Sequence, residues 1–115
     1  MEKKSTDPQC ALMKKIAESL IERESRPERV GPRISALREA LELSKASFAD
    51  TIELDRSSLS KIEQGKAGLD IAVGERIAAL FGVGLDFIYR GDLSDLPSNL
   101  KPEVMRLLVR QQTTR

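Results

Sequence analysis

Two short helical patterns joined by only three residues constrain the fold of this chain more than any other feature. The first pattern spans Lys45–Ile52 and the second spans Arg56–Gln64, with Glu53-Leu54-Asp55 between them. Ala49 in the first pattern is small, so the two helices can cross closely. A short helix, a tight turn and a second short helix form the arrangement that places a helix in the DNA major groove.

The second of these patterns separates apolar from polar positions. Leu59 and Ile62 lie on one side and would pack inward. The other side offers hydrogen-bond donors with little bulk, which suits the floor of a DNA groove; its members are Arg56, Ser57, Ser60, Lys61 and Gln64. Lys66 follows the end of the helix, where it can reach a phosphate.

Helical periodicity accounts for the rest of the chain as well. Apolar residues recur every three or four positions, and no segment alternates with period two, so the predicted fold class is all-α. Helices are expected at 9–24, 32–43, 71–81, 85–89 and 102–112, with 25–31 as a connector and 91–99 as a linker. Ser44, Asp55 and Asp70 are expected N-caps, and Gly65 and Gly82 expected stops. Gly74 inside a helix predicts close packing there.

Composition narrows the range of functions. The chain has 115 residues, of which 40% are hydrophobic, and a net charge of +1, so basic residues must gather on one face if the partner is nucleic acid. No histidine is present, which excludes a zinc finger and histidine acid-base chemistry, and Cys10 alone cannot form an intrachain disulfide. We expect a cytoplasmic protein that is not an enzyme, uses no cofactor and no metal, and has no membrane segment, because no phosphate loop, metal-ligand cluster or long apolar run is visible.

The stretch from residue 32 to residue 91 resembles the Cro/repressor-like helix-turn-helix family, also called the XRE family. The matching pieces are Leu43-Ser44, Phe48-Ala49, Arg56-Ser57-Ser58-Leu59-Ser60-Lys61-Ile62-Glu63, Gly65-Lys66, Ile77-Ala78 and Gly82-Val83-Gly84-Leu85-Asp86. The resemblance implies a five-helix DNA-binding bundle, usually dimeric on a pseudo-palindromic operator. Here the bundle would carry extra N- and C-terminal helices.

The resemblance also implies roles for single residues. Arg56, Ser57 and Lys61 fall where the family contacts bases. Positions nearer the DNA backbone are Lys45, Ser58, Ser60, Gln64 and Lys66. Lys45 stands where the family very often has Gln, and Glu53 where it commonly has Gly. If the backbone at Glu53 is left-handed, that residue costs about 1 kcal/mol.

The expected organisation has three parts: an extension with an amphipathic helix at 1–30, the DNA-binding domain at 31–91, and a linker and helix at 92–115. The apolar stripes of the two flanking helices fit either intramolecular core or a dimer seam. Glu63 is expected to form a structural hydrogen bond or ion pair. Cys10 is expected to be inert.

The leading functional hypothesis is a sequence-specific transcriptional regulator, with repression as the expected direction and a homodimer built through the flanking helices. A phage-type repressor, a host regulator and an antitoxin that represses its own operon all remain open within it. The alternative is a protein-interaction module, or an antitoxin-type partner, that keeps the helix-turn-helix as a scaffold. Four acids favour that alternative: Asp50, Glu53, Asp55 and Glu63.

Overall fold

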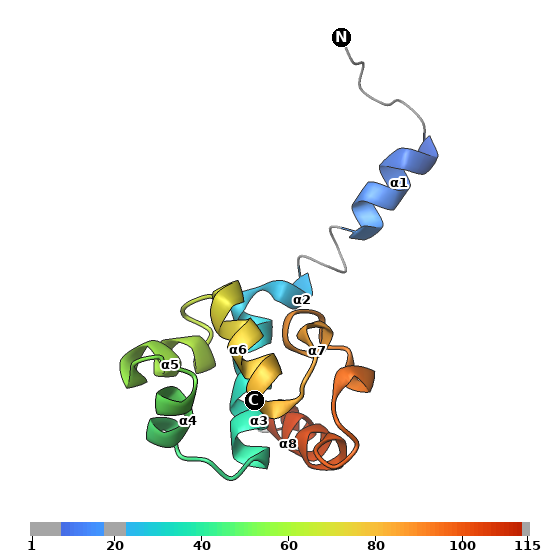
Figure 1. The fold of residues 1–115 in the computed structure, drawn as a ribbon. Coiled ribbons are helices and arrows are strands. Elements are labelled where there is room, and N and C mark those ends of the chain that lie inside the picture. Colours follow the sequence, from blue (N-terminus) through green and yellow to red (C-terminus); the bar gives the residue numbers. More distant parts are fainter. Residues whose placement is uncertain (1–7, 18–22, 114–115) are drawn as a thin grey trace.

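The computed structural model describes residues 8–17 and 23–113, which form helices and loops without any strand (Figure 1). In chain order the elements are α1 (Pro8–Ala17), α2 (Arg23–Ser25), α3 (Pro27–Ala40), α4 (Lys45–Thr51), α5 (Arg56–Glu63), α6 (Ile71–Phe81), α7 (Leu85–Arg90), the short 3-10 helix η2 (Leu93–Asp95) and α8 (Lys101–Thr113). The all-α prediction is confirmed. No helix in the described ranges combines the length and apolar character needed to cross a membrane.

The core is built around α3, which packs against α5, α7 and α8. Ile34 and Leu37 of α3 are fully buried. Phe48 of α4 stacks on Phe81 of α6, with ring centroids 5.5 Å apart. Aliphatic side chains supply most of the remaining core, including Ile52, Leu59, Ile77, Ile88 and Val104.

Local signals set the ends of α4, α5 and α6 close to the predicted positions. The side chains of Ser44, Asp55 and Asp70 accept hydrogen bonds from backbone N–H groups at the helix starts. Gly82 ends α6 in the left-handed conformation, with φ of 73°. These caps work because each satisfies a donor or acceptor that the helix itself leaves open.

Gly74 lies at a close contact, as predicted. A Cβ at this position would collide with the hydroxyl of Tyr89, which donates to the carbonyls of Leu69 and Asp70 at 3.1 Å each. The glycine therefore lets α7 approach α6.

The helix predicted at 32–43 was expected to start at Pro32, after a connector at 25–31, and this start is wrong. The helix begins at Pro27, and Pro32 lies inside it. Arg26 is extended, with ψ of 151°, as expected of a residue before proline. Pro32 is the sixth residue of the helix, so its missing N–H leaves the carbonyl of Glu28 without its usual donor.

The two flanking helices behave differently. On α8, Val104 and Leu107 are buried, so this stripe is intramolecular core. On α1, Leu12, Met13 and Ile16 are between 48% and 62% exposed. The predicted helix at 9–24 covers α1 and part of α2, while its residues 18–22 lie outside the described part.

The segment predicted as a linker at 91–99 is held against the bundle. Asp95 accepts hydrogen bonds from the N–H groups of Gly84 and Asp86, at 2.9 and 3.1 Å, through its backbone carbonyl and carboxylate respectively. Leu96 is buried. This segment therefore positions α8 for its contact with α3.

Candidate nucleic-acid interface

The turn between α4 and α5 has a defined backbone. Glu53 adopts a left-handed conformation with φ of 59°, the geometry suspected from its sequence position. The N–H of Leu54 donates to the carbonyl of Ala49 at 2.8 Å. Arg76 of α6 donates from Nε to the carbonyl of Ile52 at 2.9 Å. The side chain of Arg76, which lies outside the motif, thus stabilises the end of α4 through this hydrogen bond.

The start of α5 is organised by the carboxylate of Asp55. It accepts the hydroxyl of Ser58 at 2.6 Å and the hydroxyl of Ser57 at 2.8 Å, and also the N–H of Ser58 at 3.3 Å. These hydrogen bonds, with the Ser58 hydroxyl as the largest contribution, lower the pKa of Asp55 to about 2. The cap therefore stays ionised and binds both serine hydroxyls.

The cations expected at the interface lie on the outside of the bundle. Arg56, Lys61 and Lys66 are exposed, and no hydrogen bond or ion pair engages their side chains within residues 8–17 and 23–113. On the same helix Leu59 and Ile62 are buried in the core. At about 1.5 Å per residue, Arg56 and Lys61 are about 7.5 Å apart along the helix axis, well within the span of a major groove.

The remaining candidates surround this face. Gln64 is exposed and forms the C-cap of α5, and Lys45 is half-buried at the first position of α4. Ser58 and Ser60 are half-buried. The N–H of Lys66 donates to the carbonyl of Lys61 at 2.9 Å, which ties the loop to the helix end.

Comparison with known proteins agrees with a helix-turn-helix formed by α4 and α5. A helix-turn-helix family model matches residues 34–88, from within α3 into α7. Over 62 residues the chain is 39% identical to a protein called Control protein C.MunI from Mycoplasma sp, an alignment that covers 53% of this chain and 84% of that protein. The chain belongs to the XRE-type helix-turn-helix family. No solved structure matches it.

Membership in the XRE family makes the protein a DNA-binding transcriptional regulator. In such a motif the second helix lies in the major groove and the first crosses the backbone. In this chain those helices are α5 and α4.

Glu63 forms the predicted structural ion pair, and its partner is Arg38 of α3. Nε of Arg38 lies 2.8 Å from Oε2 of Glu63, and Nη2 lies 3.2 Å from Oε1. Nη1 also donates to the carbonyl of Leu43 at 3.0 Å. Only 12% of the arginine side chain and 5% of the glutamate side chain are exposed. The pair joins α5 to α3 and to the loop before α4.

Sequence reasoning missed three residues that support the XRE motif: Arg38, Arg76 and Gly31. Arg38 follows the buried Leu37 directly. A charged residue at the edge of an apolar stripe could have indicated a structural ion pair. Gly31 was assigned to a connector, yet a Cβ there would lie 2.5 Å from the carbonyl oxygen of Ile62 and 2.9 Å from that of Glu63. It lets α3 touch the end of α5.

Proposed function

We propose that this protein binds double-stranded DNA sequence-specifically and represses transcription as a homodimer on a pseudo-palindromic operator. The observation that carries the proposal is α5, which presents Arg56 and Lys61 unpaired on its exposed side while its other side is buried in the bundle. On this proposal the protein acts in the cytoplasm, in contact with the DNA that it regulates.

Arg56, Ser57 and Lys61 would contact bases. The planar guanidinium of Arg56 matches the O6 and N7 acceptors of guanine. The hydroxyl of Ser57 already donates to Asp55, so its free lone pair makes it an acceptor for the amino group of cytosine or adenine. Lys61 would reach a neighbouring base. The backbone contacts would come from Lys45, Ser58, Ser60, Gln64 and Lys66.

Removal of the Arg56 guanidinium tests base contact directly. We expect Arg56→Ala to lose about 1–3 kcal/mol on the operator, or about 5- to 150-fold, and much less on scrambled DNA. The measurement is a titration of both DNAs at one salt concentration, after the operator has been selected from bound genomic fragments. Arg90→Ala is the matched control, because this exposed arginine lies on α7, away from α5.

The pattern of losses separates the possible roles. Equal loss on both DNAs would assign Arg56 to the phosphate backbone and overturn its role as a base contact. No specific DNA binding by the wild-type protein would overturn the proposal and favour the protein-interaction module.

The proposed homodimer rests on apolar side chains that the bundle leaves exposed. On the flanking helices these are Leu12, Met13 and Ile16 of α1 and Met105 and Val109 of α8. A single module contacts one half-site, whereas a pair reaches two half-sites about 34 Å apart. Since α8 contributes to the core, deleting it would unfold the bundle, and exposed positions are better targets.

Charged substitutions distinguish the two possible seams. Ile16→Glu or Val109→Glu should shift the mass measured by light scattering from dimer to monomer, depending on which helix forms the seam. Ile71→Glu is the control, because Ile71 is an equally exposed apolar residue on α6. If the two flanking-helix variants both remain dimers, the seam does not use those helices.

A further inference from the structure

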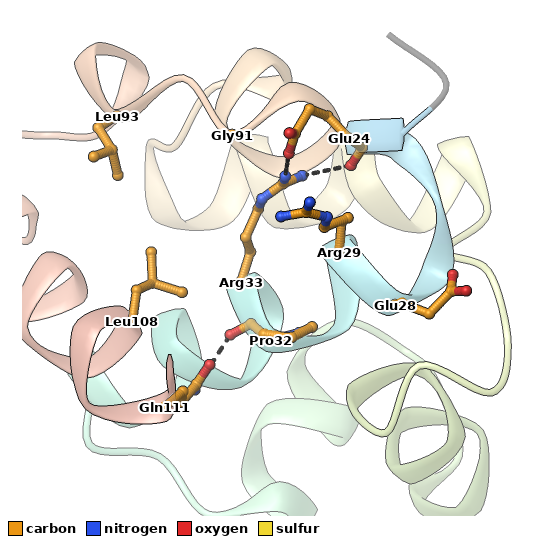
Figure 2. A pocket seen from close by; sticks show the side chains of 9 residues that line it. All are labelled: Glu24, Glu28, Arg29, Pro32, Arg33, Gly91, Leu93, Leu108 and Gln111. Atoms are coloured by element: carbon orange, nitrogen blue, oxygen red, sulfur yellow. Dashed lines mark hydrogen bonds and ion pairs between the residues drawn. The ribbon is translucent and has the colours of Figure 1, made fainter. Parts of the chain in front are cut away.

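A cavity of about 360 Å³ lies where α2, α3, η2 and α8 meet (Figure 2). Its lining side chains come from these elements and the loop before η2, and none comes from α4 or α5. The cavity is therefore separate from the surface proposed to bind DNA. Its volume lies within the usual range of small-molecule sites, about 300–1,000 Å³.

On one wall of the cavity the side chain of Arg33 is held in place, and its charge is balanced by Glu24. Arg33 is 6% exposed and donates from Nη1 to the carbonyls of Glu24 and Ile88, at 2.9 and 3.0 Å. Its Nη2 forms an ion pair with the carboxylate of Glu24. Gly91 lies so close that a Cβ there would be 2.9 Å from this guanidinium. Arg33 thus joins α2, α3 and α7, and most of its guanidinium is already engaged by protein groups.

Arg29, in contrast, is a positively charged residue of the cavity wall that does not take part in these contacts. It is exposed, and no hydrogen bond or ion pair engages its side chain within the described ranges. Burial lowers the pKa of Arg33, and the nearby positive charge of Arg29 lowers it further, while Glu24 opposes both effects. Figure 2 shows the Arg29 guanidinium beside Arg33, whereas Glu28 points away from it. An anion at Arg29 would relieve this repulsion.

The opposite side of the cavity is apolar. Leu93 of η2 and Leu108 of α8 line it, and Figure 2 shows both across the cavity from the two arginines. Next to them Gln111 donates from Nε2 to the carbonyl of Pro32 at 3.5 Å. The cavity thus combines an unpaired cation at one end with an aliphatic wall at the other.

We infer that this cavity binds a small organic carboxylate with a compact apolar body. The carboxylate pairs with the fork of the Arg29 guanidinium, which suits two-point contact with a planar anion. The apolar body lies against Leu93 and Leu108.

The site is placed to act as an effector site. Arg29 lies two residues before Gly31 and Pro32 directly after it, and the carbonyls of Ile62 and Glu63 at the end of α5 lie against Gly31. The start of α3 also backs onto the loop after α5, since a Cβ at Gly65 would lie 3.2 Å from the Cα of Glu28. A ligand that shifts this part of α3 would therefore move the supports of α5.

The test uses the full-length protein without DNA and two probes of nearly equal shape, 3-phenylpropionate and its neutral amide, 3-phenylpropanamide. Calorimetric or NMR titration should give tighter binding of the acid. Arg29→Gln should weaken the acid about tenfold and leave the amide unchanged, as expected for loss of one charge-assisted contact. Leu93→Ala should weaken both probes. Arg26→Gln is the matched control, because Arg26 is an exposed arginine three positions away that does not line the cavity.

Several results would overturn the inference. They are no binding of the acid, equal affinity for acid and amide, or equal effects of the Arg26 and Arg29 variants. An acid affinity that falls as protein concentration rises would also overturn it, because a second copy of the chain would then occupy the cavity. Since DNA is absent from the titration, these outcomes are independent of whether the protein binds an operator.

Discussion

Glu53 occupies a backbone conformation that its side chain disfavours. Its φ is 59°, in the left-handed region, where a Cβ costs about 1 kcal/mol relative to glycine. The residue is exposed. The three-residue turn imposes this geometry because α5 must start immediately after Asp55 while Leu54 keeps its bond to Ala49.

Glu53→Gly should therefore stabilise the fold by about 1 kcal/mol, because glycine adopts this conformation without strain. Urea unfolding followed by circular dichroism measures the change. Glu53→Gln is the control, since it removes the charge and keeps the strain, and its stability should match the wild type. A glycine variant no more stable than the glutamine variant would show that the turn relaxes instead of storing strain.

The ionised carboxylate of Asp55 stabilises the start of α5. Its folded pKa of about 2 lies below its ordinary value of 3.8, so the cap contributes stability fully above pH 3.8. That contribution is lost as the pH falls through about 2. Asp55→Ala should be less stable than the wild type at neutral pH, and the difference should shrink between about pH 4 and about pH 2.

Asp55→Asn separates capping from charge. Asparagine keeps a cap acceptor without a titrating carboxylate, so its stability should change less over the same acid range. Thermal unfolding at a series of pH values measures both variants. A constant difference between wild type and Asp55→Ala across this range would contradict the lowered pKa.

The crossing of α3 over α5 holds the recognition helix in place. Two contacts define it: the carbonyls of Ile62 and Glu63 against Gly31, and the ion pair of Arg38 with Glu63. The first brings the backbones together and the second fixes the two helices laterally. Since α3 also packs on α7 and α8, any shift at this crossing would spread through the bundle.

Gly31→Ala should destabilise the protein by about 2 kcal/mol, because the new methyl group meets rigid backbone carbonyls and α3 must move away from α5. Chemical denaturation measures the loss. Gly68→Ala is the control, because its Cβ would find its nearest atom, Cγ of Pro27, at 4.0 Å. Equal stability of the two variants would show that α3 and α5 do not touch as described.

The bundle as a unit carries almost no net charge, so any attraction to DNA must be local. The chain has 19 basic and 18 acidic residues. Two of the acids are paired with cations inside the fold, Glu63 with Arg38 and Glu24 with Arg33, whereas Asp55 stays ionised. The unpaired cations Arg56, Lys61 and Lys66 lie exposed on the motif together with the exposed acids Asp50 and Glu53, so the attraction depends on which part of the face meets the DNA.

Lys66→Ala should weaken binding to all DNA sequences alike and make the slope of log affinity against log salt shallower by about one. Loss of one phosphate contact releases one counterion fewer. Fluorescence anisotropy over a range of salt concentrations measures the slope for wild type and variant. Lys101→Ala on α8 is the control and should leave the slope unchanged. An unchanged slope for Lys66→Ala would remove this residue from the backbone contacts.

The sequence by itself determined the elements whose ends depend on near neighbours. Ser44, Asp55 and Asp70 start α4, α5 and α6, and Gly82 stops α6, through hydrogen bonds that reach at most one helical turn. The left-handed turn at Glu53 was also predicted. Spacing along the chain encodes such features directly, because donor and acceptor are only a few residues apart.

The tertiary structure alone decided which distant residues meet. Arg38 and Glu63 are 25 positions apart, and Arg33 and the carbonyl of Ile88 are 55 apart. The close approach at Gly31 and the burial of α8 follow from packing, not from local propensity. A helical pattern specifies which side of a helix is apolar, but the partner for that side depends on how the whole chain buries its surface.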